Sequence, residues 1–124
     1  MIRSWVALNA VKGLGPARIA SLLQKYESPE ALFKESPRAL QAHPGVTAAV
    51  CARLCDPAIF DEAQRQCERA EKEGIAIVTL ADERYPSLLR EVFAPPPVLY
   101  VKGQVEAFSR HAVAMVGTRR PTRY

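Results

Sequence analysis

Apolar residues recur at helical spacing through the first half of the chain. In the stretch "RSWVALNAV", Trp5, Leu8 and Val11 stand three positions apart and would form one apolar stripe along a helix. A second pattern, "PARIASLLQKY", begins at Pro16, and proline is favoured at the first position of a helix. Its inward-facing apolar positions are Ile19, Leu22, Leu23 and Tyr26. We therefore predict two helices joined by the short turn "KGLGP".

Signals for further helices continue toward residue 73. The segments "SPEALF" and "SPRAL" each combine a serine that can cap a helix with a proline at the first helical position. The stretch "HPGVTAAVCARLCD" repeats the earlier turn in a weaker form, followed by a short helix. Asp56 is the expected N-cap of the longest helix, with Pro57 in its first turn, and Gly74 is its expected C-terminal stop. The sequence thus predicts an all-helical part over residues 1–73.

After Gly74 the pattern changes to short apolar runs. The runs "IAIVTL" (75–80), "VLYV" (98–101) and "AVAMV" (112–116) are rich in branched side chains. Each predicts a strand with both faces covered, which is typical of parallel sheets. The stretch between the first two runs predicts a turn, a short helix from Pro86 and a link stiffened by proline. An α/β part is therefore expected to begin at residue 74.

Composition and charge indicate a globular protein with a mild basic bias. The chain has 124 residues, 48% of them hydrophobic and 24% charged, with a formal net charge of +4. This length suits one ordinary domain, or a small domain with part of another. Four arginines and no acidic residue lie between Arg110 and Tyr124, which is compatible with a polyanionic partner. No signal peptide or membrane-spanning run is visible, so we expect a cytoplasmic protein that does not enter a membrane.

The stretch "VKGLGPARIASLL" has the form of a helix-hairpin-helix. Gly13 and Gly15 permit a tight connection that a side chain at either position would obstruct. The turn and the start of the next helix present unpaired backbone N–H groups, which favour a phosphate oxygen, and Lys12 and Arg18 would supply charge. The same pattern equally fits a compact turn in which Leu14 fills the core. For the weaker "HPGV" repeat, which has no basic residue in its turn, a structural role is favoured.

The stretch "AVAMVGTRRPT" predicts a second anion-binding turn. A buried strand that ends in glycine places the next backbone amides at the carboxyl edge of a sheet, where open α/β folds bind ligands. Gly117 would allow a phosphate to approach, Thr118 would offer a hydroxyl and an amide, and Arg119 a planar fork of donors. Arg120 would add charge. The stretch is neither a dinucleotide fingerprint nor a Walker motif, and Arg119 would alternatively pair with an internal carboxylate.

Neither a metal site nor a catalytic group is predicted. Cys51, Cys55 and Cys67 lack framework spacing, and the two histidines, His43 and His111, show no ligand spacing with them. Buried, unreactive thiols are the simpler interpretation. No nucleophile elbow or signature Cys–His pair is present. We therefore expect no cofactor and no enzymatic activity.

Taken together, three stretches resemble the DNA-processing protein A (DprA/Smf) family. "GLGP" with "ASLLQKYESPEALF" is similar to its N-terminal helical domain, and "GIAIVTLADERYPSLLREVFAPPPVLYVKG" to the entry into its extended Rossmann-like domain. "VAMVGTRRPTRY" is similar to the family's glycine–serine/threonine–arginine strand and loop. The resemblance implies an α/β fold: an all-helical helix-hairpin-helix (SAM-like) domain over residues 1–73, then the opening strands of a Rossmann-like parallel sheet over 74–124, incomplete here. The chain would then be an N-terminal piece of a longer protein.

The resemblance also implies a function. Family members bind incoming single-stranded DNA in natural transformation, protect it and help to load the RecA recombinase, without catalysis and usually as dimers. The family's strand-binding pocket corresponds to Gly117, Thr118 and Arg119, with Arg120 beside them. The residues carried over for the helical hairpin are Lys12, Gly13, Gly15 and Arg18. Expected partners are single-stranded DNA, RecA through parts absent from this chain, and a second copy through exposed strand edges and apolar faces.

Two other functions remain open. The helical half would serve as a protein-interaction module if its glycines were purely architectural. Alternatively, the chain would belong to a nucleotide- or phosphoribosyl-binding enzyme on a related Rossmann scaffold. That second alternative is disfavoured, because no second glycine-rich loop and no acid–base pair is visible.

Overall fold

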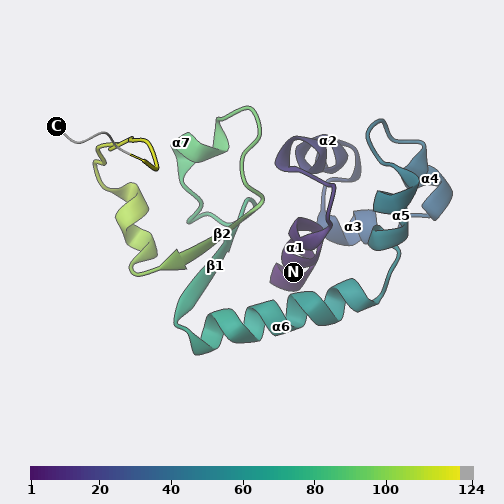
Figure 1. Ribbon diagram of the computed structural model, residues 1–124, viewed down its shortest axis with the longest axis horizontal. Helices are drawn as coiled ribbons and strands as arrows, with labels where there is room; N and C mark the ends of the chain where they lie inside the picture. Colours follow the sequence, from purple (N-terminus) through teal and green to yellow (C-terminus); the bar gives the residue numbers. More distant parts are fainter. Residues whose placement is uncertain (121–124) are drawn as a thin grey trace.

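The computed structural model describes residues 1–120, which form a group of helices followed by a two-stranded hairpin (Figure 1). The helices of the first part are α1 (Ile2–Ala10), α2 (Pro16–Tyr26), α3 (Pro29–Phe33), α4 (Pro37–Gln41), α5 (Ala48–Leu54) and α6 (Ala58–Lys72). The second part holds β1 (Ile75–Thr79), α7 (Ser87–Arg90), β2 (Val98–Lys102) and the short 3-10 helix η1 (Val105–Ser109). In Figure 1, α6 runs along the lower edge, α1 lies above it, and the hairpin rises from the far end of α6.

The two serine caps predicted for the short helices are confirmed. Ser28 Oγ accepts a hydrogen bond from the Ala31 amide over 3.2 Å at the start of α3. Ser36 Oγ accepts one from the Ala39 amide over 3.3 Å at the start of α4. In each helix the proline after the serine takes the first position, where its missing N–H costs no hydrogen bond.

The start of α6 differs from the prediction by one residue. Pro57, expected in the first turn, is itself the N-cap residue, so the helix begins at Ala58. Asp56 still satisfies an amide at the helix start, because its Oδ1 accepts from the Ala58 N–H over 3.0 Å. At the other end Gly74 has a φ of +65°, which a glycine adopts readily, and the predicted stop is confirmed.

The main hydrophobic core is built around α1. Trp5, Val6, Ala7 and Leu8 are all buried, and α1 packs along α6. Both helices also contact the hairpin, and Val98 of β2 belongs to the same buried cluster as the helical residues. The core therefore continues from the helical part into the hairpin, while the division into domains 1–73 and 74–124 stays a prediction.

The pairing of the two strands corrects the expectation of a parallel arrangement. β1 and β2 are antiparallel, with Ile75 opposite Lys102 and Thr79 opposite Val98. The ladder extends one step further, because the Leu80 amide donates to the Pro97 carbonyl over 3.0 Å. A parallel pair needs a crossover that packs on the sheet, usually a helix, and the only helix in this connection is the four-residue α7. The connection instead folds back as a wide hairpin.

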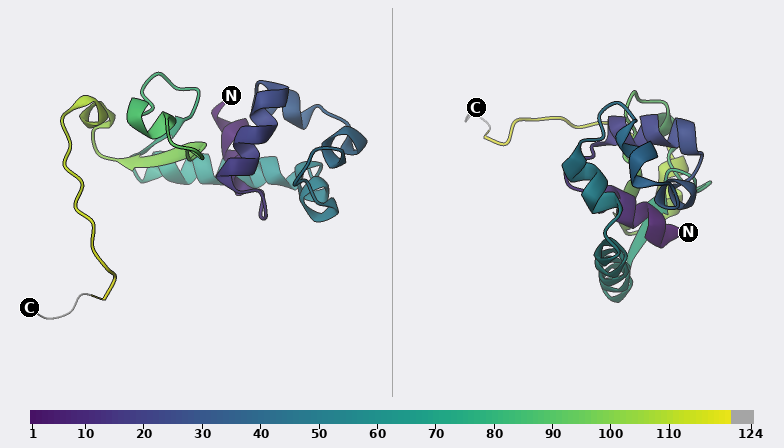
Figure 2. Two further views of the ribbon diagram at one scale, coloured as in Figure 1. Left: turned by 90° about the horizontal axis from the view of Figure 1, so that it is seen from above. Right: turned by 90° about the vertical axis from the view of Figure 1, so that its right-hand side faces the viewer.

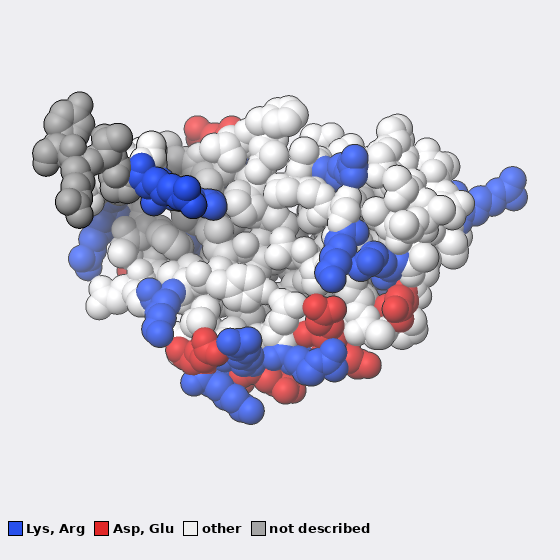
Figure 3. All heavy atoms as spheres, viewed as in Figure 1, with Lys and Arg blue, Asp and Glu red and all other residues white. Residues whose placement is uncertain are grey.

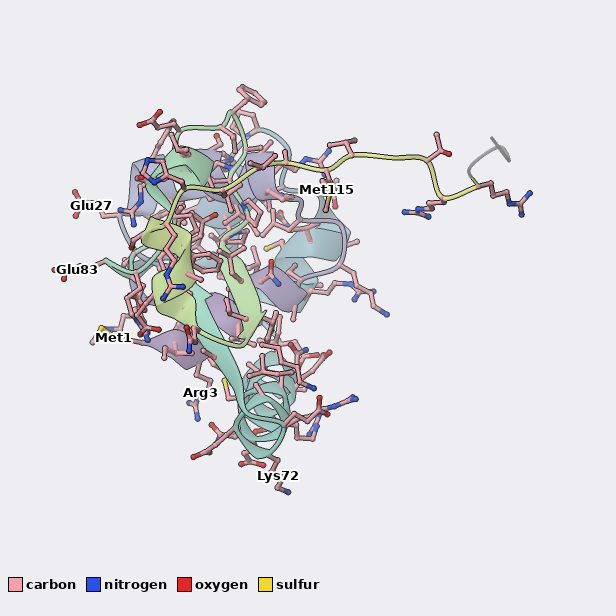
Figure 4. The ribbon with its side chains drawn as sticks, turned by 90° about the vertical axis from the view of Figure 1, so that its left-hand side faces the viewer. Met1, Arg3, Glu27, Lys72, Glu83 and Met115 are labelled. Carbon is pink, nitrogen blue, oxygen red and sulfur yellow. The ribbon has the colours of Figure 1, made fainter. Side chains whose placement is uncertain are left out.

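The third predicted strand does not form in the described part of the chain. Residues 112–116 are extended but have no strand partner, and the side chains of Val113, Met115 and Val116 are 92%, 96% and 95% exposed. Figure 2 shows this segment leaving the body of the molecule, and Figure 4 shows the chain continuing outward beyond Met115. Extended chain needs a neighbouring strand to bond its backbone, and none lies beside it within residues 1–120. Arg123, part of the basic terminal segment, lies outside the described residues.

None of the helices formed by residues 1–120 combines the length and the apolar character that a membrane crossing requires.

Candidate nucleic-acid interface

The first hairpin, residues 12–15 between α1 and α2, has the predicted form. Val11 closes α1, and the Leu14 amide donates back to the Val11 carbonyl over 3.1 Å. Leu14 is 5% exposed and belongs to the main core, so the turn is fixed by burial of its central residue. Gly15 is the N-cap of α2, in extended backbone and without a capping side chain. Pro16 has no N–H, and the Arg18 and Ile19 amides both donate to the Gly15 carbonyl over 3.0 Å, so the Ala17 amide is the one left open to a partner at the start of α2.

The two glycines of this turn differ in what they require. Gly13 has a φ of +89°, and a Cβ there would lie 3.3 Å from Val50 Cγ2. The positive φ favours glycine, and the approach of Val50 leaves little room for a side chain. Gly15 has a φ of −80°, and a Cβ there would meet nothing within 4 Å. The expectation that a side chain at either position would obstruct the turn is thus confirmed for Gly13 and wrong for Gly15, at least within the chain.

The second hairpin, residues 43–47 between α4 and α5, repeats the first closely. At one constant spacing, residues of the first hairpin have counterparts in the second: Leu8 and Leu40, Gly13 and Gly45, Leu14 and Val46, Gly15 and Thr47, Arg18 and Val50, Ile19 and Cys51, Leu22 and Leu54. The backbone bonds recur as well, because the Val46 amide donates to the His43 carbonyl over 3.1 Å. Sequence analysis underestimated this repeat; the even spacing of its glycines and leucines was the available signal.

The two turns pack on one another reciprocally. Gly13 of the first turn lies against Val50 of α5, and Gly45 of the second turn, with a φ of +86°, lies against Arg18 of α2. Since Arg18 and Val50 are counterparts in the repeat, the two contacts are equivalent. Each turn therefore depends on the helix that follows the other turn.

Basic residues are confined to the first turn. Lys12 is exposed, and Arg18 folds back so that its Nη1 donates to the Gly13 carbonyl over 2.8 Å. The counterparts in the second turn are Pro44 and Val50, which carry no charge. The structural role favoured for "HPGV" agrees with this arrangement.

The surface next to the first hairpin carries both signs of charge. A pocket of about 190 Å³ lies between the end of α1, the end of α5 and the start of α6. It is lined by Ala10, Val11, Arg53, Asp56, Ala58, Ile59, Glu62 and Arg65. Along α6, basic and acidic side chains alternate over the lower edge of the molecule (Figure 3). The face of α6 is therefore a solvated helix surface and not a basic track.

The residues predicted for the second anion-binding turn lie apart from the hairpin. Gly117, Thr118, Arg119 and Arg120 are exposed on the extended segment that leaves the body, and they do not sit at the carboxyl edge of a strand. A Cβ on Gly117 would meet nothing within 4 Å. Within residues 1–120, the ion pairs are those of Met1, Arg69 and Arg84, so Arg119 pairs with no described carboxylate. The assignment of these residues to DNA contact stays a prediction.

The comparisons with known proteins match both parts of the chain. The model of DNA recombination-mediator protein A matches residues 76–124, and that of the SAM-like helix-hairpin-helix tandem matches residues 6–58. Protein Smf of Synechocystis is 31% identical over 122 residues, which cover 95% of this chain. The chain belongs to the DprA/Smf family. DNA processing protein DprA of Bacillus subtilis is 35% identical over 54 residues, 43% of this chain.

The matches to the DprA/Smf relatives cover a minor part of each. The aligned regions span 31% of Protein Smf and 18% of the B. subtilis protein. No solved structure matches the chain. The tandem model spans both hairpins, in agreement with the repeat seen in the structure, and the mediator model spans the β1–β2 hairpin and residues 117–120.

Sequence analysis missed a polar cluster in the connection between β1 and β2 of this DprA/Smf chain. The Asp82 carboxylate accepts from Arg84 Nε over 3.0 Å and from Arg84 Nη2 over 2.7 Å, and these bonds lower the pKa of Asp82. The Asp82 carbonyl accepts from Arg90 Nη2 over 2.8 Å. Tyr85 donates its hydroxyl to the Pro96 carbonyl over 2.8 Å, and burial raises its pKa. Every partner lies within the connection, so the cluster holds the connection in shape.

The three cysteines belong to two helices, with Cys51 in α5, Cys55 at the C-cap of α5 and Cys67 in α6. Cys51 is buried and its Sγ donates to the Pro37 carbonyl over 3.4 Å, whereas Cys55 is exposed. Desolvation raises the pKa of Cys55, and the neighbouring Cys51 thiol raises it further. Residues 1–120 bring no three His, Cys, Asp or Glu side chains together in a group that could hold an ion.

Proposed function

We propose that this chain belongs to a recombination mediator that binds incoming single-stranded DNA in natural transformation, protects it and helps to load the RecA recombinase. It does so in the cytoplasm and without catalysing a reaction. Family membership supports a role in DNA processing. The observation that carries the proposal is the open turn of the first hairpin, where Gly15 leaves the start of α2 bare beside the exposed Lys12.

The hairpin forms one contact with the DNA backbone in this proposal. The open Ala17 amide at the uncapped start of α2 offers a donor to a phosphate oxygen, and the helix dipole favours the negative charge. Lys12 adds a cation in the same turn. The residues that we assign to this site are Lys12, Gly13, Gly15 and Arg18, of which Arg18 serves the site through its hydrogen bond to the Gly13 carbonyl. Such contacts hold the backbone without reading sequence.

The terminal segment forms the second contact. We propose that residues 112–116 pair as a strand of a Rossmann-like parallel sheet in a protein of the relatives' length, with 1–73 and 74–124 in separate domains. Gly117, Thr118, Arg119 and Arg120 would then follow the carboxyl end of that strand and bind phosphate. The exposure of Val113, Met115 and Val116 supports this, because apolar side chains on a strand are stabilised by cover. RecA binding and self-association belong to the same longer protein.

A protein-interaction module is the second candidate function, and the observation that favours it lies in the second part of the chain, not in the helical half to which the sequence assigned this role. A groove of about 780 Å³ lies between α7 and the segment 107–112. Leu88, Val92 and Phe108, which line it, are 80%, 45% and 41% exposed. Exposed apolar side chains in such number are typical of surfaces that bind another protein.

Binding of a labelled oligo-dT at several salt concentrations tests the proposal. The parent chain and a family protein of the relatives' length would each be compared with Arg119→Ala, Lys12→Ala and the control Lys72→Ala, which changes the outer end of α6 (Figure 4). For single strands the slope of log K against log salt becomes shallower by about 0.7 for each phosphate that the protein no longer neutralises. We expect Arg119→Ala and Lys12→Ala to reduce the slope and Lys72→Ala to leave it unchanged. Absence of oligonucleotide binding by the longer protein at low salt would refute the proposal.

A further inference from the structure

We infer that Arg18 is a positioning residue that fastens the two hairpin turns together, and that it does not itself contact phosphate. The part of this inference that concerns DNA rests on the proposed function. The part that concerns the turns does not, because it follows from contacts inside the chain.

The first contact is made by the guanidinium group. Arg18 Nη1 donates to the Gly13 carbonyl oxygen over 2.8 Å. This carbonyl belongs to the exposed turn and lies outside the hydrogen-bond ladder of α2, so water would be its partner if Arg18 were absent. A hydrogen bond from a charged donor is about twice as strong as a neutral one. Arg18 therefore holds the backbone of the turn at the residue whose φ of +89° shapes it.

The second contact is made by the stem of the same side chain. A Cβ on Gly45 would lie 3.3 Å from Arg18 Nε and 3.4 Å from its Cδ. The stem therefore runs directly over the second turn, in space that only glycine leaves free. One side chain thus touches the backbone of both turns.

The repeat shows what is particular to Arg18. Its counterpart Val50 covers Gly13 in the equivalent way, but an isopropyl group cannot donate a hydrogen bond. Only the contact made by Arg18 combines packing on one turn with a bond to the other. The second hairpin, which lacks basic residues, therefore supports the first by packing against the Arg18 side chain. A change at Gly45 is expected to reach the Gly13 turn through Arg18.

A double-mutant cycle in urea unfolding tests the contact between the turns. Gly45→Ala is expected to lower the folding equilibrium constant roughly tenfold, through its positive φ and the tight approach of the Arg18 side chain. Gly74→Ala is the matched control, because Gly74 has a φ of +65° and a Cβ there would meet nothing within 4 Å. In the Arg18→Ala background, Gly45→Ala should lower the free energy of unfolding by no more than Gly74→Ala does. If Gly45→Ala lowers the free energy of unfolding equally in the parent and in the Arg18→Ala background, the inference is overturned.

Salt-dependent binding of oligo-dT separates positioning from direct contact. Arg18→Met and Arg18→Lys are compared with Lys12→Met. We expect Arg18→Met to raise the dissociation constant severalfold with an unchanged salt slope, and Arg18→Lys to recover part of the affinity. A fall in the slope of about 0.7 for Arg18→Met would make Arg18 a phosphate contact and overturn this part. If the parent chain does not bind oligo-dT, it is the proposed function that fails for this chain, and the unfolding cycle still decides whether Arg18 joins the turns.

Discussion

Gly15 and Thr47 occupy the same position in the two hairpins, the N-cap of the following helix, but only Thr47 caps its helix with a side chain. Thr47 Oγ1 accepts from the Val50 amide over 3.3 Å, whereas Gly15 leaves the start of α2 bare. There is room for a side chain at Gly15, since a Cβ would meet nothing within 4 Å. Packing within the chain thus gives no reason for glycine at position 15, and the proposed approach of a DNA phosphate would supply one.

Replacing Gly15 with serine should separate stability from binding. We expect Gly15→Ser to leave the free energy of unfolding unchanged or to raise it by a few tenths of a kcal/mol, because serine caps helices slightly better than glycine. The same change should weaken binding of oligo-dT, because the side chain would occupy the site of the phosphate. Urea unfolding and fluorescence anisotropy measure the two effects. Undiminished binding by this variant would count against the hairpin contact.

Unlike Gly15→Ser, Gly13→Ala should lower the stability of the folded chain. The φ of +89° and the 3.3 Å approach to Val50 Cγ2 both oppose a methyl group at this position. We expect a loss of about 1–3 kcal/mol in the free energy of unfolding, which covers backbone strain and mild overpacking. Chemical denaturation measures it, with Gly15→Ala as the control that changes the same turn without strain. Equal stabilities of the two variants would contradict the geometry of the turn.

The main core should depend strongly on Leu22. This side chain is fully buried on α2 in the cluster that joins the helices and the hairpin. Leu22→Ala removes buried apolar volume, and we expect it to lower the free energy of unfolding by about 2–5 kcal/mol. Leu88→Ala is the control, because Leu88 is 80% exposed and its loss should change stability by about 0.5 kcal/mol or less. Thermal and urea unfolding of both variants provide the comparison.

Acid should weaken the connection between the strands through Asp82. Hydrogen bonds from Arg84 lower the pKa of Asp82 below its ordinary value of 3.8 in the folded chain. The stability that this carboxylate contributes is therefore fully present above the unfolded pKa and is lost as the pH falls through the lower, folded pKa. Asp82→Asn should reduce the loss of stability at low pH, as measured by urea unfolding between about pH 2 and 6. If the free energy of unfolding depends on pH in the same way in this variant as in the parent, the ion pair with Arg84 contributes nothing to stability.

Cys55 should react slowly despite its exposure. Desolvation and the adjacent Cys51 thiol raise its pKa above 9.0, so little of the reactive thiolate is present at neutral pH. In a Cys67→Ser background, labelling by a disulfide reagent at pH 8 should be slower than for a free thiol. Cys51→Ala should accelerate it by removing one of the two causes. Labelling at the rate of a free thiol in the parent would show that the pKa is not raised.

Local signals predicted much of the helical part because their physics is local. The serine and proline pairs before α3 and α4, and the stop at Gly74, each act within a few residues of their position. The turn at Gly13 and the burial of Leu14 follow from a short pattern in the same way. The sequence could not show that the fold leaves room for a side chain at position 15, because this depends on whether another part of the chain packs there, as Val50 does against Gly13.

The hairpin and the terminal segment could not be derived from local patterns. Apolar runs such as 75–80 and 98–101 predict strands but do not show whether the strands run parallel or antiparallel. The antiparallel pairing agrees with the shortness of α7, which is too short to serve as the crossover helix of a parallel pair. The run 112–116 has the composition of a strand, yet a strand forms only where a partner offers its backbone. The placement of Arg119 depends on that partner, so its contact with DNA could not be derived from the residues around it.

One helix, α6, packs on α1 and β1 together, and this has a consequence for motion. Local opening of the hairpin would expose Val98 and the buried cluster around α1 to solvent. Partial opening at this end therefore has a high free-energy cost. Amide protons of β1 and of α1 should therefore exchange with solvent deuterium through a common cooperative event, whereas those of residues 111–120 should exchange at once.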